Sequence, residues 1–179
     1  MIHDIDNIKI DGTWCGCVET TNALLFFIED VKGASTRIVD ENNSEENLLC
    51  VKNADNREVL HVSIDNCLFK QPSELIGERC DCMIINRNHV SYVEIGLNTK
   101  DKLSNVTIKA KKARAQLGKT IKYFNENGFS EKGKRIDAVF CGRKKLPRSN
   151  TIILEIRETF QCKYSTKAKY IEDNNLVVK

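Results

Sequence analysis

The sequence predicts an α/β fold in which a mixed central sheet is flanked by helices. Two short apolar runs, at 78–85 and 91–97, have the length of strands, and the turn residues 86–89 between them predict an antiparallel hairpin. A long amphipathic helix is predicted at 106–124, because its apolar residues recur at steps of three and four. The next apolar run, at 134–141, is typical of a strand reached by a helical crossover.

A chain of 179 residues is most simply one domain, 1–179. We divide it into an N-terminal arm at 1–47, a core at 48–148 and a C-terminal part at 149–179. The arm contains an apolar segment at 20–31 that fits a short helix and, almost as well, a buried strand. The C-terminal part is predicted to hold a helix and then a short hairpin of two strands (150–164, 168–171 and 176–178).

The core is predicted to begin with two strands, at 48–51 and 58–69. In the second of these, the side chains alternate between apolar and polar with a period of two. Leu60 and Val62 share one face, whereas His61 and Ser63 share the other. The pattern therefore predicts a strand that is buried on one face only.

The net charge of +3 conceals a strong asymmetry along the chain. Residues 1–99 carry 8 basic and 17 acidic side chains, whereas residues 100–148 carry 15 basic and 4 acidic ones. A positive segment of this density suits a polyanion, above all nucleic acid. The alternative is that the segment faces an acidic surface, either in the N-terminal third or on a partner protein.

The N-terminus shows no basic segment followed by an apolar run, so we expect neither a secretory signal nor a membrane span. The eight cysteines are accordingly expected to be reduced and the protein cytoplasmic. Within a strand, Cys80 and Cys82 would share one face and Asp81 the other. A zinc site is the alternative, although a one-residue spacing is shorter than structural zinc sites favour (Cys15, Cys17, Cys80 and Cys82).

Three short motifs carry a resemblance: Cys80-Asp81-Cys82, Val93-Glu94-Ile95-Gly96 and Gln116-Leu-Gly-Lys-Thr120. In this order, on strand, strand and helix, they resemble the core of the PD-(D/E)xK, or restriction-endonuclease-like, superfamily. The chain also looks like a group of small bacterial proteins of that superfamily. The stretches concerned lie between residues 48 and 148 (64–68, 78–81, 115–117, 120–121, 139–143 and Pro147).

The resemblance implies a metal-dependent nuclease site. Asp81 and Glu94 would be ligands of Mg²⁺ or Mn²⁺, a hard cation that prefers oxygen ligands. Gln116 would occupy the family's helix position. In family members, a lysine two residues after the second acid orients the attacking water and stabilises negative charge. This chain has Gly96 at that position, which departs from the pattern.

Two interpretations of this departure remain open. In one, the lysine function has moved to Lys112, one helical turn from Gln116, or to Lys100 in the preceding loop. Helical spacing places a whole polar stripe beside the apolar one (Lys109, Lys112, Gln116, Lys119 and Tyr123). In the other, the site is degenerate and the fold survives as a nucleic-acid-binding or assembly module.

Simpler roles remain for the same acids. Glu94 could form a cross-strand ion pair with Arg79 or Arg87. Asp65 is a candidate third acid, but its sequence context also fits a turn. The family's first helix acid would fall on Glu45 or Glu46, in a polar Asn-rich segment that predicts a loop.

The leading hypothesis is a nuclease-fold subunit with a degenerate catalytic site, which binds nucleic acid, with DNA favoured over RNA, in a bacterial system of defence against phage or other foreign DNA. The binding residues would be Lys109, Lys112 and Lys119 on the helix, together with Arg143, Lys144 and Lys145 in the loop 142–148. Alternatives are an active endonuclease with a relocated lysine and a scaffold that docks an acidic partner protein. No glycine-rich phosphate loop is present, so any nucleotide hydrolysis would come from an ATPase partner. The resemblance also admits a homodimer.

Overall fold

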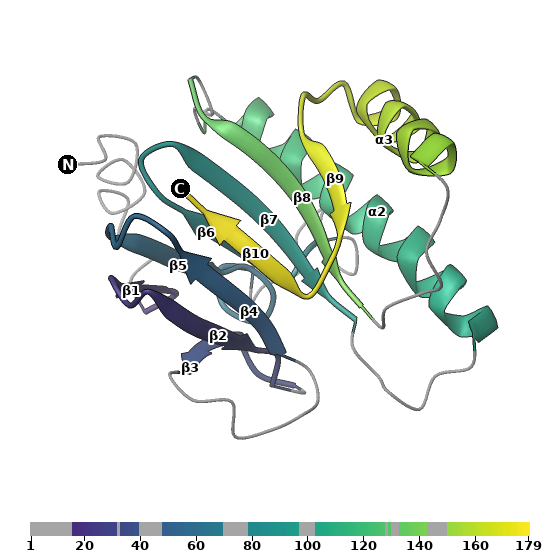
Figure 1. Ribbon diagram of the computed structural model, residues 1–179. Coiled ribbons are helices and arrows are strands. Elements are labelled where there is room, and N and C mark those ends of the chain that lie inside the picture. Colours follow the sequence, from purple (N-terminus) through teal and green to yellow (C-terminus); the bar gives the residue numbers. More distant parts are fainter. Residues whose placement is uncertain are drawn as a thin grey trace.

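The computed structural model describes residues 16–31, 33–39, 48–69, 79–96, 103–127, 129, 133–142 and 150–179. In these ranges the chain forms three layers, namely two helices, a six-stranded sheet and a four-stranded sheet (Figure 1). The six-stranded sheet is the middle layer, with an apolar core on each face. None of the described helices is both long and apolar enough to cross a membrane.

The six-stranded sheet is mixed and has the strand order β1-β5-β6-β7-β8-β9. The first four strands pair antiparallel, whereas β7, β8 and β9 are parallel. The predicted hairpin is confirmed, because β6 and β7 are antiparallel neighbours. The six strands are β1 Val18–Thr21, β5 Val59–Ser63, β6 Cys82–Ile85, β7 His89–Ile95, β8 Arg135–Cys141 and β9 Lys169–Glu172.

Two helices, α2 Leu103–Glu126 and α3 Asn150–Tyr164, pack on one face of this sheet. The buried side chains of α2 recur at helical spacing, as the sequence predicts (Ala110, Ala113, Leu117, Ile121 and Phe124). The helices approach each other closely where Gly118 of α2 meets the ring of Tyr164, which leaves no space for a larger side chain at position 118. Both predicted helices are therefore present, and they lie on the same face.

A second, four-stranded sheet covers the opposite face, with the order β10-β4-β2-β3. Its strands are β2 Leu25–Glu29, β3 Arg37–Val39, β4 Leu48–Asn53 and β10 Asn175–Val178. The segment at 20–31 thus contributes strands, and its interpretation as a helix is wrong. Alternating side chains such as Phe26 and Ile28 point to the six-stranded sheet, which is the period of a strand.

The last two strands do not form the predicted hairpin. Strand β9 pairs with β8 in the six-stranded sheet, and β10 pairs with β4 in the other sheet. Leu176 and Val178 of β10 belong to the apolar core between the sheets, whereas Tyr170 of β9 belongs to the core under the helices. A short sequence between two strands allows a hairpin but does not require one, and here burial in two separate cores decides the outcome.

Strand β5 is buried on both faces and not on one only. His61 and Ser63 lie on the predicted polar face, but a hydrogen-bond network covers them. His61 Nδ1 lies 2.9 Å from Glu19 Oε2, and its Nε2 lies 3.0 Å from Thr36 Oγ1. The Thr36 hydroxyl also donates to Ser63 Oγ at 3.0 Å. Buried polar groups need such partners, and the network links β1, β5 and the start of β3.

A disulfide joins Cys17 to Cys67. Because β1 pairs with β5, the residue before β1 comes close to the turn after β5, and the two Cα atoms lie 5.6 Å apart. The expectation that the cysteines are all reduced is therefore wrong for this pair. The disulfide also removes Cys17 from the zinc alternative, since a zinc ligand must be a thiolate.

Replacing Cys67 by serine should destabilise the protein. The disulfide closes a loop with a sequence separation of 50 residues, for which the chain-entropy model gives about 4 kcal/mol. The expected fall in Tm is roughly 8–16 °C for a chain of this size. Thermal unfolding without reductant measures it, with Cys162→Ser at an exposed free cysteine as the control. Equal Tm values for the two variants would contradict the prediction.

Candidate metal and nucleic-acid site

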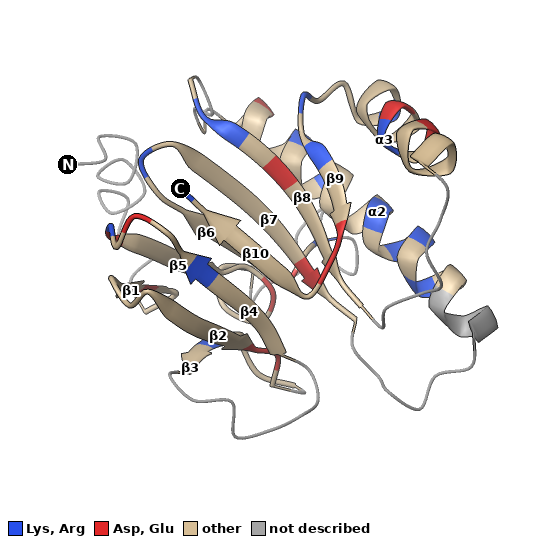
Figure 2. Cartoon of the chain, viewed as in Figure 1, with Lys and Arg blue, Asp and Glu red and all other residues tan. Residues whose placement is uncertain are grey.

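Asp81 and Glu94 lie opposite each other where the pairing of β6 with β7 ends. The ladder ends at the pair Cys82 and Val93, so Asp81 and Glu94 take the next register position. Asp81 Oδ2 accepts a hydrogen bond of 2.5 Å from the backbone N–H of Ile95. Figure 2 shows an acidic position at this end of β7 and basic positions along α2. The structure therefore brings together the two carboxylates that the sequence singles out.

Side-chain alternation in β7 directs Glu94 toward α2. Val90 and Tyr92 belong to the core under the helices, whereas Val93 and Ile95 belong to the core between the sheets. Glu94 shares the parity of Val90 and Tyr92, so it lies on the helix face. The face carries the apolar core under the helices, so the charge of a carboxylate on it is costly to bury.

Both carboxyl groups have raised pKa values. Burial raises the pKa of Asp81 to about 7, although the hydrogen bond from the Ile95 N–H opposes the shift. Burial also raises the pKa of Glu94 well above its usual range, and the nearby charge of Asp81 adds to the effect. The charge of Lys112 lowers both pKa values. Lys112 is thus close enough to act on both acids, as the hypothesis of a relocated lysine requires.

Two oxygen atoms at this site are buried and have no hydrogen-bond partner in the described part of the chain. They are Glu94 Oε2 and Gln116 Oε1. The amide nitrogen of Gln116 is held, because Nε2 donates to the carbonyl oxygen of Arg79 at 2.9 Å. Buried acceptors are nearly always satisfied in folded proteins, so these two oxygens mark the site as one with unused hydrogen-bonding capacity among the described residues.

The donor set suits a hard divalent cation. Two carboxylates and an amide oxygen are the ligand types that Mg²⁺ accepts, and Mg²⁺ usually keeps several waters beside one or two protein carboxylates. Among the described residues, no group of three or more His, Cys, Asp or Glu side chains is placed to hold a metal ion. The site therefore fits a cation bound by the pair Asp81 and Glu94, with water or phosphate completing its coordination.

Two further acids lie near the pair. Asp30, after β2, and Asp65, after β5, both raise the pKa of Asp81 and Glu94 through their charge. Burial and the charge of Asp65 raise the pKa of Asp30 itself. Sequence reasoning missed Asp30, because it follows a strand of the other sheet and has no motif around it. The number of acids gathered here increases the electrostatic benefit of a bound cation.

Arg79 does not form the cross-strand ion pair with Glu94 that the sequence allows. Its Nε donates to Asp65 Oδ1 at 2.6 Å, so Arg79 pairs with Asp65 and not with Glu94. The Nη1 atom of Arg79 is buried and has no hydrogen-bond partner among the described residues. Asp65 is thereby held in an ion pair, and Arg79 retains one donor without a partner among the described residues.

Phe140 fills the space beside Gly96. The two residues lie on neighbouring parallel strands, and a Cβ atom added to Gly96 would be 2.7 Å from Phe140 Cε2. A Cβ added to Gly142 would also lie 2.7 Å from the same ring. The aromatic ring is thus seated over two glycines and buried. A lysine at position 96 would displace it, which explains structurally why this position carries no side chain.

A sequence expectation for the two thiols beside Asp81 is wrong. Cys80 and Cys82 do not share a face: Cys80 packs in the core under the helices and Cys82 in the core between the sheets. The strand starts only at Cys82, so the alternation assumed for the two thiols does not extend back to Cys80. Cys80 is held differently, because its N–H donates to Thr120 Oγ1 of α2 at 2.9 Å.

The predicted basic residues divide into three groups. Lys112 is exposed on α2, and its charge acts on both carboxyl groups. Lys109 and Lys119 are half-buried, and each already has an interaction partner. The remaining candidates lie outside the described residues (Lys100, Arg143, Lys144 and Lys145), as do the two acids Glu45 and Glu46.

Comparison with known proteins finds no matching family model, no matching curated protein and no matching solved structure.

Replacing Glu94 by glutamine should stabilise the metal-free protein, and more so at about pH 8 than at about pH 5. A carboxyl group with a raised pKa contributes stability below its unfolded-state pKa and loses it as the pH rises through the folded-state value, which is about 7 for Asp81. The shift of Glu94 has the same sign. Glutamine keeps the shape and removes the charge. Thermal unfolding in EDTA at both pH values measures the effect.

The matched control for this experiment is Glu126→Gln, at an exposed position near the end of α2. Each kcal/mol by which the substitution increases the free energy of unfolding should raise Tm by roughly 2–4 °C. A Glu94→Gln protein that is less stable than the native chain at both pH values would show that the carboxylate has a structural partner, which would contradict the interpretation of its buried oxygen.

Replacing Gly96 by alanine should destabilise the protein by about 1–3 kcal/mol, because the new Cβ overlaps the Phe140 ring. The cost should largely disappear when Phe140 is first replaced by alanine, since the two residues share one space. Urea denaturation of the two single variants and the double variant measures this coupling. Additive effects would show that the ring does not oppose a side chain at position 96.

Proposed function

We propose that the chain is a Mg²⁺- or Mn²⁺-dependent endonuclease of the restriction-endonuclease-like type, with Asp81 and Glu94 as the metal ligands. The observation that carries the proposal is the buried, unpartnered Oε2 of Glu94 beside a second carboxyl group. Keeping two neighbouring carboxylates ionised in an apolar environment is costly unless a cation compensates them. A divalent cation provides this compensation and explains why the pair is retained.

The order of elements supports the type of fold. The described chain runs β5, β6, β7, α2, β8 and α3, which is the order of strands and helices on which the resemblance rests. Asp81 precedes β6, Glu94 lies near the end of β7, and Gln116 lies on α2. In addition, a four-stranded sheet covers the face of the central sheet that is opposite the two helices.

The polar side chains of the site fit roles in phosphodiester hydrolysis. Asp81 and Glu94 would hold a divalent cation, which when bound would supply water activation and offset charge on the scissile phosphate. Gln116 Oε1 can accept a hydrogen bond from a water molecule. Arg79 Nη1, which has no hydrogen-bond partner in the described residues, can donate to a phosphate oxygen.

Lys112 replaces the lysine that position 96 lacks. It projects from α2, whereas a lysine at position 96 would project from the end of β7. Its charge already lowers the pKa of Asp81 and Glu94. A positive charge aimed at the reacting phosphate stabilises the negative charge that develops there, an effect that typically accounts for a factor of about 10²–10³ in rate.

A second candidate function is nucleic-acid binding without cleavage, as a subunit of a bacterial system of defence against foreign DNA. The observation that favours it is the Phe140 ring over Gly96, which replaces a polar catalytic position by buried apolar packing. The defence context rests on the resemblance alone. In this case the carboxyl pair would serve to bind a cation and position nucleic acid, and a separate protein would carry out catalysis.

Plasmid nicking distinguishes the two functions. The native chain with Mg²⁺ or Mn²⁺ should nick supercoiled plasmid, and Asp81→Asn or Glu94→Gln should abolish nicking. Lys112→Ala should reduce the rate by about 10²–10³, because it removes the positive charge at the phosphate. Lys122→Ala, on an exposed part of the same helix, is the control with the same loss of charge.

Calorimetry with Mg²⁺ or Mn²⁺ completes the test. Cation binding that Glu94→Gln abolishes, without nicking, would favour the second candidate. Nicking that survives both Asp81→Asn and Glu94→Gln would contradict the proposed site. A native chain that neither nicks plasmid nor binds a cation would overturn the proposal.

A further inference from the structure

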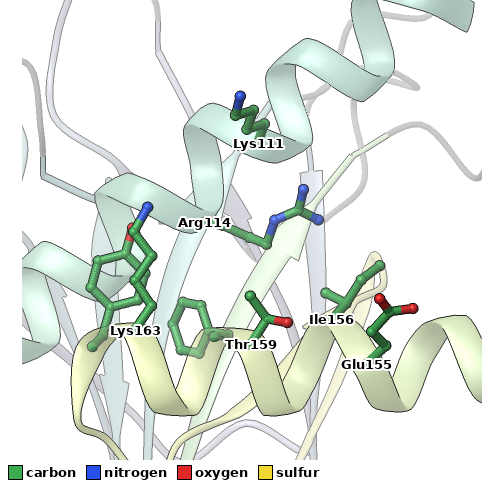
Figure 3. Close-up of a pocket in the computed structure, with 8 residues that line it drawn as sticks. Lys111, Arg114, Glu155, Ile156, Thr159 and Lys163 are labelled. Atoms are coloured by element: carbon green, nitrogen blue, oxygen red, sulfur yellow. The ribbon is translucent and has the colours of Figure 1, made fainter.

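A hollow of about 380 Å³ lies between α2 and α3, away from the carboxyl pair. It is drawn in Figure 3, where Lys111 and Arg114 come from α2 and Lys163, Thr159 and Glu155 from α3. Three of the eight lining residues are cations, and Glu155 is the single acid among them. The hollow is therefore positively charged, and its polar groups come from both walls.

Arg114 is the central cation of this hollow. Figure 3 shows its side chain extending from α2 into the space between the helices. The guanidinium lies over the ring of Tyr170, with Cζ 5.7 Å from the ring centroid. Its Nη1 atom forms an ion pair with Glu172 Oε1 at 3.6 Å, a distance too long for a hydrogen bond, and is buried without a hydrogen-bond partner in the described residues.

Tyr164 and Lys163 form the part of the hollow where α2 and α3 approach each other. Tyr164 packs against Gly118, so the two helices come close and the ring lines the hollow. Lys163, in the last turn of α3, has its Nζ 5.3 Å from the centroid of that ring. A lysine at the C-terminal end of a helix is placed favourably by the helix dipole. The hollow is thus lined both by the aromatic rings of Phe160 and Tyr164 and by cationic side chains.

We propose that this hollow binds a backbone phosphate of nucleic acid, with Arg114 as the main hydrogen-bond donor and Lys111 and Lys163 as flanking charges. The Arg114 side chain is 25% exposed, and a guanidinium can donate two parallel hydrogen bonds to an oxyanion. The proposal deepens the nucleic-acid binding in the proposed function and is independent of cleavage. Lys112 acts on the carboxyl pair from a different side of α2 than Lys111 and Arg114, which line the hollow. The phosphate bound in the hollow is therefore a different one from the scissile phosphate at the carboxyl pair.

A second basic hollow makes nucleic acid a better ligand than a single small anion. Its volume is about 610 Å³, and its lining includes Ser165, the residue that follows Tyr164 of the first hollow. Four cations line it at the start of β8 and around the start of β9 (Lys134, Arg135, Lys167 and Lys169). A polyanion needs cations at successive positions along a surface, and two basic hollows whose lining residues are adjacent in sequence at the end of α3 meet this need.

Binding of a short fluorescent DNA duplex, followed by anisotropy at several salt concentrations, tests the proposal. Lys163→Ala should lower the slope of log affinity against log salt by about 0.9, the value for one lost phosphate contact. Arg114→Lys keeps the charge and removes the guanidinium fork, and should weaken binding about tenfold. Lys52→Ala is the matched control, because Lys52 is exposed on β4 of the sheet opposite the helices.

Three results would overturn the proposal in distinguishable ways. No binding of DNA by the native chain would overturn this inference and the nucleic-acid binding of the proposed function together. DNA binding that Lys163→Ala and Arg114→Lys leave unchanged would overturn the hollow alone. An acidic peptide that binds more tightly than DNA, and that both substitutions weaken, would assign the hollow to an acidic protein. Circular dichroism of each variant confirms that it is folded.

Discussion

Burial of the six-stranded sheet on both faces is the constraint on which the rest of the structure depends. Every polar side chain that enters this layer must find a partner, because water is excluded from both sides. The chain meets this requirement with networks that connect elements. Asp137 shows it best: although burial opposes the charge, hydrogen bonds from His89 and Arg135 hold the pKa of Asp137 below its usual value.

The carboxyl pair is an exception to this pattern, and the contrast supports its functional interpretation. Asp81 and Glu94 lie in the same layer as Asp137, yet burial raises their pKa values, and Glu94 Oε2 has no partner in the described chain. Asp137 shows that neighbouring side chains can satisfy a buried acid in this layer, whereas Glu94 Oε2 has no such partner among the described residues. Buried acids with strongly raised pKa values are more frequent at functional sites than elsewhere.

Sequence reasoning recovered the elements that periodicity specifies and failed where distant segments meet. The strands β6, β7 and β8 and both helices have strong local patterns, so they could be predicted, and the pairing of Asp81 with Glu94 followed from the hairpin. Asp30 could not be found in this way, because the packing of one sheet on the other brings it near the pair. The same holds for Phe140, whose contact with Gly96 depends on the parallel register of β7 and β8.

The position of α2 links the carboxyl pair to the basic hollow. Two hydrogen bonds tie this helix to the chain just before β6, from Gln116 Nε2 to the Arg79 carbonyl and from the Cys80 N–H to Thr120 Oγ1. On its other side, Gly118 packs against Tyr164 of α3. The helix therefore has contacts on two sides, to the segment that carries Asp81 and to α3. In the proposed function, these contacts place Lys112 beside the carboxyl pair and Arg114 in the hollow on the same rigid element.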